Sequence, residues 1–118
     1  KGVSMNKEIE KLFKNFEVND VSIPIAFIRY RGKSKTYLTY QEINNKPELE
    51  ADDIVLYSAS IYDIDIYSDG NYLKIVEEVK KKMSESNFIW IEDSLDMYEE
   101  DTGLYHKTIT FAKERSVL

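Results

Sequence analysis

The feature that most constrains the fold is a change of hydrophobic period between residues 62 and 83. From 62 to 67 the period is two, which is typical of a strand: Tyr62, Ile64 and Ile66 share one face, and Asp63, Asp65 and Tyr67 share the other. Further along, apolar residues recur at helical spacing at Tyr72, Ile75, Val76, Val79 and Met83. We therefore expect a strand that runs into a helix over 70–85, with Ser68 or Asp69 as the helix cap. The helix should cover the strand face that carries Ile64 and Ile66.

The chain before this passage predicts one helix and three strands. A helix is expected over 5–16, capped by Asn6 or Ser4. Strands are expected over 25–31 and 36–43, and the short link between them is typical of a hairpin. Residues 44–53 have turn residues and no apolar period, so we expect a loop there. The long strand then covers 54–67, with a bulge, a bend or a close backbone approach at the small residues 58–60.

Two further strands are expected after the second helix. The first begins at Phe88 and is interrupted by an acidic stretch, after which Met97 and Tyr98 can resume it. The second covers 104–112, and the polar tail 113–118 is expected to fray. The pattern predicts an α+β fold: a single domain with a mainly antiparallel sheet of about five strands flanked by two helices, in the order α-β-β-β-α-β-β. A length of 118 residues suits one domain, which we place at 5–118. We interpret residues 1–4, which precede Met5, as a cloning remnant.

Composition excludes several classes of protein. A hydrophobic content of 42% with 13% aromatic residues excludes a disordered chain. The formal net charge of −6 disfavours non-specific binding to nucleic acid, and we expect no sequence-specific nucleic-acid partner. The chain has no cysteine, so disulfide and thiol chemistry are excluded. No apolar run approaches membrane-spanning length and no secretory signal is visible, so no membrane partner is expected.

The residue types that usually carry catalysis are sparse. His106 is the single histidine, and general-base catalysis needs positioned partners that the pattern does not show, so we interpret it as a structural or surface residue. No nucleophile elbow surrounds a serine, and no glycine-rich phosphate loop is present. We therefore predict no catalytic residue, no cofactor and no tightly bound metal.

Two clusters of charge are the candidate interaction sites. The basic one consists of Arg29, Arg31, Lys33 and Lys35, which stand out in an acidic chain. It can be a solvated hairpin tip or a patch for an acidic neighbouring surface. The acidic one comprises Asp63 and Asp65, together with the stretch 92–101. It can be a solvated face, a metal site, for which the spacing is only a weak signal, or an interface. We favour an interface that pairs with the basic cluster of another copy. Tyr67 is a candidate for the apolar part of that contact.

Several segments together resemble a known protein family. They are Ile23 to Phe27, Gly32 with Thr36 to Tyr40, Tyr62 to Tyr72, the helix positions Val76, Val79 and Met83, and Tyr98 to Lys107. The chain from about 20 to 112 resembles the small tail-completion or tail-terminator (head–tail joining) proteins of long-tailed bacteriophages and prophages. Its most specific parts are the strand-to-helix passage at 62–72 and the segment Glu99 to Lys107. Family members often carry tryptophan where this chain has Tyr67, which is a mild departure.

The resemblance implies a virion component rather than an enzyme. It implies a ring of identical copies, a hexamer, at the top of the tail tube, with tail-tube and head-completion proteins as partners. It also implies a location in the tail or neck of the virion, and in the host cytoplasm during assembly. From the residues alone two alternatives stay open. One is a small metal-dependent enzyme that uses Asp63, Asp65 and the acids at 96–101, and the other is a regulatory protein-binding module.

Overall fold

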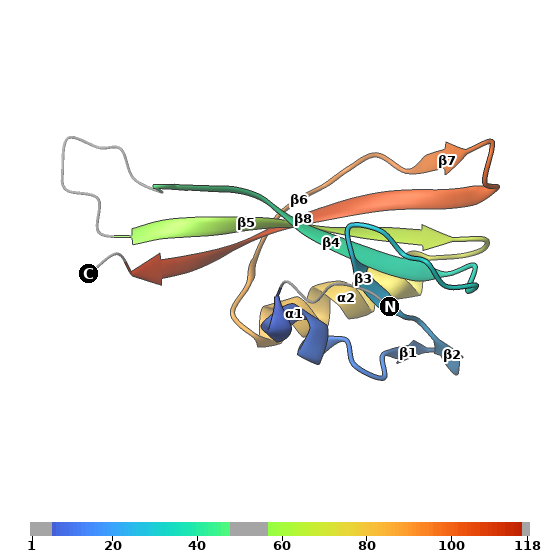
Figure 1. Cartoon of the computed structure of the whole chain (residues 1–118), viewed down its shortest axis with the longest axis horizontal. Coiled ribbons are helices and arrows are strands. Elements are labelled where there is room, and N and C mark those ends of the chain that lie inside the picture. The colour runs from blue at the N-terminus through green and yellow to red at the C-terminus, as the bar shows by residue number, and fades with distance from the viewer. Residues whose placement is uncertain (1–5, 48–56, 117–118) are drawn as a thin grey trace.

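The computed structural model describes residues 6–47 and 57–116, and it has the predicted α+β fold (Figure 1). The elements in chain order are α1 (Lys7–Leu12), β1 (Glu17–Val18), β2 (Val21–Ser22), β3 (Ile25–Phe27), β4 (Tyr37–Pro47), β5 (Tyr57–Ser68), α2 (Leu73–Glu85), β6 (Ile89–Asp93), β7 (Met97–Glu99) and β8 (Leu104–Ser116). The strands β1 and β2 form a small separate hairpin, which the sequence reading did not predict.

The main sheet has the strand order β3-β4-β5-β8-β6, and β7 also pairs with β8 beyond the end of β6. All pairs in this sheet are antiparallel except β3 with β4. Figure 1 shows both helices on one side of the sheet, and among the described residues no helix covers the other side. We call this uncovered side the open face. The side chains on this face therefore pack only against strands and loops within the described ranges.

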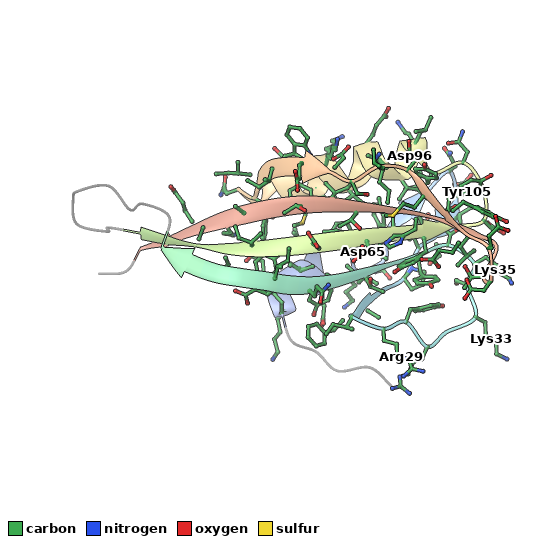
Figure 2. All side chains as sticks on the ribbon, turned by 90° about the horizontal axis from the view of Figure 1, so that it is seen from above. Arg29, Lys33, Lys35, Asp65, Asp96 and Tyr105 are labelled. Atoms are coloured by element: carbon green, nitrogen blue, oxygen red, sulfur yellow. The ribbon has the colours of Figure 1, made fainter. Side chains whose placement is uncertain are left out.

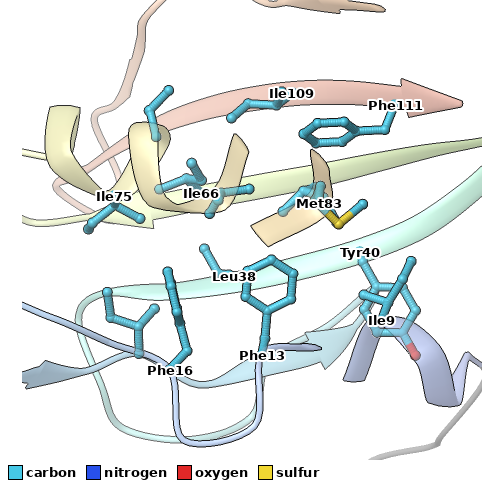
Figure 3. Packing of buried hydrophobic residues seen from close by; sticks show 14 of the residues in the cluster. Ile9, Phe13, Phe16, Leu38, Tyr40, Ile66, Ile75, Met83, Ile109 and Phe111 are labelled. Carbon is cyan, nitrogen blue, oxygen red and sulfur yellow. The ribbon is translucent and has the colours of Figure 1, made fainter. Parts of the chain in front are cut away.

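The core lies between the sheet and the two helices. Alternate residues of β5 supply Ile64 and Ile66, and the apolar stripe of α2 supplies Val76, Val79 and Met83, all of them buried in one cluster. Figure 3 shows side chains from α1, the sheet and α2 meeting in this layer. The prediction that the second helix covers Ile64 and Ile66 is confirmed.

The first two predicted strands do not form a hairpin. β3 ends at Phe27 and runs parallel to β4, with Ile25 opposite Leu38. The alternating pattern continues to residue 31, but Ile28 has a φ of +61°, in the left-handed region that a β-branched residue rarely adopts. The Ile28 N–H donates to the carbonyl of Tyr40 at 2.9 Å, so the chain turns away from the strand at this residue.

The loop predicted over 44–53 is partly wrong, because β4 continues through Asn44 to Pro47. The rest of that segment, and the start of the predicted strand at 54–56, lie outside the described residues. The irregularity expected at 58–60 of β5 is on the partner strand instead. Glu42 faces Tyr62 and Asn44 faces Ile61, which leaves Ile43 as the extra residue of a bulge. The small residues at 58–60 keep a regular register with β8.

Several predicted boundaries also differ from the structure. α1 is capped by Asn6, one of the two expected caps, but it ends at Leu12, and Asn15 beyond it is left-handed with a φ of +58°. α2 begins at Leu73 without Ser68 or Asp69 as its cap. The Ser68 hydroxyl accepts the Gly70 N–H inside the turn, and Asn71 Oδ1 accepts the Leu73 N–H. The tail expected to fray from 113 belongs to β8 as far as Ser116. The resumed strand at Met97 and Tyr98 is confirmed as β7.

Candidate functional site at the two sheet edges

The four basic candidates lie in the connection from β3 to β4, at one edge of the sheet. We call residues 29–35 the basic segment. It contains no acidic residue, and the side chains of Arg29, Arg31, Lys33 and Lys35 are all exposed. None of these four side chains makes a hydrogen bond or ion pair with another residue in the ranges 6–47 and 57–116. The segment therefore presents four positive charges that the described chain does not neutralise locally.

Aromatic packing holds the basic segment in place. The ring of Tyr30 stacks on Tyr37 with centroids 4.4 Å apart, and the Tyr30 hydroxyl accepts the Ser34 N–H at 3.0 Å. Gly32 lies directly under this ring, because a Cβ atom there would be 2.1 Å from the Tyr30 hydroxyl oxygen. The Tyr30 ring thereby connects Ser34 to Tyr37 of β4, which limits the directions in which the charges of the segment can point.

The acidic stretch lies at the opposite edge. We call residues 92–101 the acidic segment; it runs from the end of β6 through β7, and all six of its charged residues are acidic. Three of them have internal partners: Asp93 is paired with Lys80 at 2.9 Å, Asp96 with Lys107 at 3.0 Å, and Glu99 with His106 at 3.2 Å. The other three are exposed and form no ion pair within the described part of the chain: Glu92, Glu100 and Asp101.

Two of these pairings shift the carboxyl groups toward the charged form. Burial alone would raise the pKa of Asp93, but hydrogen bonds from Trp90 and Lys80, with the charge of Lys80, hold that pKa below its usual value. Hydrogen bonds from the Tyr72 hydroxyl and from Lys107 lower the pKa of Asp96. Both carboxylates therefore stay ionised near neutral pH, and the segment remains acidic there.

Strand order puts the two segments on opposite sides of the sheet. β3 and β4 stand at one end of the order, and β6 and β7 stand at the other. Figure 2 shows Arg29 and Lys33 along one side of the sheet and Asp96 along the other, with Asp65 between them. One molecule thus carries a positive edge and a negative edge. The sequence identified both clusters, but their placement depends on β8 lying between β5 and β6.

The two strand carboxylates, Asp63 and Asp65, are not part of the acidic edge. They lie in the middle of the open face, where Asp63 accepts the Thr110 hydroxyl at 2.7 Å and Asp65 Oδ1 lies 2.9 Å from His106 Nε2. Burial raises the pKa of Asp63, with further contributions from Asp65 and Glu92, although the Thr110 hydrogen bond opposes them. The interface role predicted for these two residues is therefore better assigned to the 92–101 segment.

Tyr67 belongs to a row of rings that crosses the open face. Tyr30, Tyr37, Tyr67 and His106 stack in sequence, with centroid distances of 4.4, 4.9 and 4.2 Å. Burial, aided by the charges of Asp65 and Glu99, raises the pKa of Tyr67 to about 12, so its hydroxyl stays protonated. The half-buried Tyr67 ring connects the basic side of the sheet to His106. The ring packs between Tyr37 and His106, so it offers little free surface for a contact with another molecule.

An apolar surface at the acidic edge is the feature that sequence reasoning missed. Its exposed residues are Ile89, Trp90, Ile91, Leu95, Met97 and Tyr98. β6 pairs with β8 on one side, and no described strand pairs with its other side. The signal was present in the run of four apolar residues from Phe88 to Ile91, because consecutive apolar residues in a strand place apolar side chains on both faces. An uncovered edge of this kind is a common site of association.

The arrangement offers little for metal or membrane chemistry in the part of the chain that is described. No group of three or more histidine, cysteine, aspartate or glutamate residues there is placed to hold a metal ion. The metal-site interpretation depended on the fourth predicted strand pairing with the third, but β6 pairs with β8. Across residues 6–47 and 57–116, neither helix is long and apolar enough to span a membrane.

Comparison with known proteins adds no family assignment. The chain matches no model of a known protein family, and no curated protein matches its sequence. The functional argument therefore depends on the resemblance of the segments quoted above, on the fold and on the two sheet edges.

Proposed function

We propose that the chain is a structural virion protein at the head–tail junction of a long-tailed bacteriophage or prophage. It acts in tail completion, tail termination or head–tail joining, through a homo-oligomeric ring. The observation that carries the proposal is the position of the basic segment and the acidic segment on opposite edges of one sheet. The family resemblance supplies the biological setting, and the charge geometry supplies a means of assembly.

A ring follows from this geometry when the basic edge of one copy meets the acidic edge of the next. Such a contact is heterologous, because two different surfaces meet, and it closes into a ring when the rotation between copies permits. The resemblance favours six copies. The unpaired cations and the unpaired acids are exposed, so their attraction should weaken as ionic strength rises. The apolar residues of β6 and β7 supply the area that charge alone cannot provide.

This function needs surfaces for other proteins rather than a catalytic pocket. In the proposed setting the ring rests on tail-tube proteins and contacts head-completion proteins, and the protein is located in the tail or neck of the virion. The open face and the two ends of the sheet stay available when the edges are occupied by neighbouring copies. A single small domain can then contact several partners at once.

Reversal of charge in the basic segment tests the proposal. A phage carrying Lys33→Glu with Lys35→Glu should fail to complete its tails, because the two exchanges bring the net charge of the basic segment to zero and remove its attraction for the acidic edge of the next copy. The measurement is electron microscopy of tails and of their joining to heads. Lys14→Glu with Lys81→Glu is the matched control, since both lysines are exposed on other surfaces and the net charge changes equally.

A compensating exchange sharpens the same test. Glu100→Lys with Asp101→Lys, added to the two lysine exchanges, should restore assembly because positions 33 and 35 of one copy and positions 100 and 101 of the next again carry opposite charges. Circular dichroism should show the same fold in every variant, since all four positions are exposed. Tails of normal length joined to heads in the Lys33→Glu, Lys35→Glu phage would show that the basic segment is only a solvated tip.

A further inference from the structure

Leu95 is an exposed apolar residue within the acidic segment. It is 84% exposed, the largest exposure among the large hydrophobic residues that the structure describes. The backbone before it is fixed, because Ser94 N–H donates to the carbonyl of Thr108 at 2.8 Å and Thr108 N–H donates to Ser94 Oγ at 2.9 Å. After it, Asp96 accepts hydrogen bonds from Tyr72 and Lys107. A backbone held in this way has little conformational freedom left to lose when Leu95 binds.

A pocket lies at the other edge, beside the basic segment. Its volume is about 290 Å³, and it is bounded by α1, β3, β4 and β5. The residues that line it include Phe27, Ile28, Tyr40 and Tyr62, with Asn6 and Glu42 on its polar side. Small-molecule sites usually measure about 300–1,000 Å³, so this pocket is at the lower limit and suits a single side chain.

Ile28, which lines this pocket, is exposed and has a strained backbone conformation. It is 56% exposed and has a φ of +61°, a conformation that is costly for a β-branched side chain. The hydrogen bond from its N–H to the carbonyl of Tyr40 holds it there. The chain therefore maintains a strained, exposed apolar residue at the mouth of the pocket, where a polar residue or glycine would be less costly. A contact that buries Ile28 would account for this choice.

We propose that Leu95 of one copy inserts into the pocket beside Ile28 of a second copy. The inference rests on the proposed ring, and it identifies the apolar contact between neighbours. The opposite charges of the two segments favour this partner: Leu95 lies within the acidic segment, and the basic segment begins at Arg29, the residue that follows Ile28 of the pocket. Among the described residues, the one charged residue that lines the pocket itself is Glu42. The two features lie at opposite edges of the sheet, as a head-to-tail contact between identical copies requires.

The absence of native cysteine allows a direct test by disulfide trapping. The variant carries Ile28→Cys and Leu95→Cys in one chain. These positions lie at opposite edges of the sheet, whose neighbouring strands are about 4.8 Å apart, so the two thiols of one molecule are well beyond the roughly 7 Å Cα limit for a disulfide. Any bond between them must join two molecules. Mild oxidation at high protein concentration and low salt should give a ladder of oligomers on a non-reducing gel.

The matched control replaces the second position with an exposed leucine elsewhere. Leu73 is 64% exposed at the start of α2, so Ile28→Cys with Leu73→Cys should give no such ladder. Leu95→Ala should weaken self-association by about 10- to 100-fold, the range for removing a buried leucine side chain from a contact. Leu73→Ala should leave self-association unchanged, and both variants should unfold like the parent because both positions are exposed.

Each outcome separates this inference from the proposed ring. A ladder with the 28/95 pair and none with the 28/73 pair supports the contact. Zero-length amine–carboxyl coupling between Lys33 or Lys35 and Glu100 or Asp101 of another copy, without a 28/95 disulfide, would overturn the inference and leave the ring standing. Ladders of equal yield from both cysteine pairs would also overturn it. Neither coupling nor disulfide, under the same conditions, would overturn the ring and this contact together.

Discussion

The imidazole Nε2 atom of His106 lies 2.9 Å from the Oδ1 atom of Asp65, and the Nδ1 atom on the other side of the ring lies 3.2 Å from Glu99. One side chain of β8 thereby connects β5 to β7. The hydrogen bond that His106 donates to Asp65 is the largest cause of the raised His106 pKa; partial burial opposes it, and the charges of Asp65 and Glu99 add to it. When it is protonated, His106 is a cation between two carboxylates on the open face.

This relationship predicts a pH dependence of stability. The folded-state pKa of His106 is raised above the unfolded value of about 6.5, so its contribution is complete below that pH and is lost as pH rises through the folded pKa. The free energy of unfolding lost in His106→Gln should be larger at about pH 5.5 than at about pH 9, by about 1 to 2 kcal/mol. Urea unfolding of parent and variant at both pH values measures it.

Two variants test whether the pH dependence comes from the contacts of His106 with Asp65 and Glu99. Glu99→Gln removes one of the two carboxylates, so it should reduce the pH dependence in part. Glu100→Gln removes an exposed acid that makes no ion pair with the described residues, so it should leave the dependence unchanged. A difference between parent and His106→Gln that stays constant from pH 5.5 to 9 would mean that His106 contributes only by stacking on Tyr67.

The sequence predicts the packing of α2 correctly because that packing depends on local periodicity. A period of two at 62–67 and a helical stripe from Ile75 to Met83 each identify their buried face without reference to the rest of the chain. The parallel pairing of β3 is different. The pattern from 25 to 31 continues through Ile28, and the turn there depends on Tyr40 and Tyr37, which come later in the chain.

The candidate site was likewise predictable from the sequence only in part. The basic and acidic clusters are visible as charge runs, whereas their separation onto two edges results from long-range pairing of β8 with β5 and β6. The pairing of His106 with Asp65 is also long-range, since 41 residues separate the two in the chain. Periodicity cannot indicate such pairs, because the same alternation of apolar and polar residues along a strand is compatible with several strand orders.

Val76 tests the contact between α2 and the sheet. Val76 is buried in the cluster that includes Ile64 and Ile66, so Val76→Asp would place an unpaired charge in an apolar layer. The free energy of unfolding should fall by several kcal/mol, on the order of 3. Leu73→Asp, an exposed position at the start of the same helix, should change it by less than about 0.5 kcal/mol. Thermal or urea unfolding measures both, and a Val76→Asp protein that melts like the parent would mean that α2 does not bury this side.

Gly32 and Tyr30 test how the basic segment is held. A Cβ atom at Gly32 would lie 2.1 Å from the Tyr30 hydroxyl oxygen and 2.4 Å from the ring carbon that bears it. The ring can make room only by leaving its stack on Tyr37 and releasing the Ser34 N–H. Gly32→Ala should therefore keep the fold, at a cost of about 1 kcal/mol, since the segment is at the surface. The near-ultraviolet circular dichroism of the tyrosine rings should change, and self-association should weaken because Arg31 and Lys33 flank the altered residue.

Gly70→Ala is the matched control for this variant. A Cβ atom at Gly70 has nothing within 4 Å, and its φ is not positive, so alanine should be accepted there within about 0.5 kcal/mol. Its tyrosine spectrum and its self-association should equal those of the parent. A parent-like tyrosine spectrum in Gly32→Ala would mean that the segment accepts the methyl group by moving its backbone. In that case the stack of Tyr30 on Tyr37 would not be what orients the positive edge.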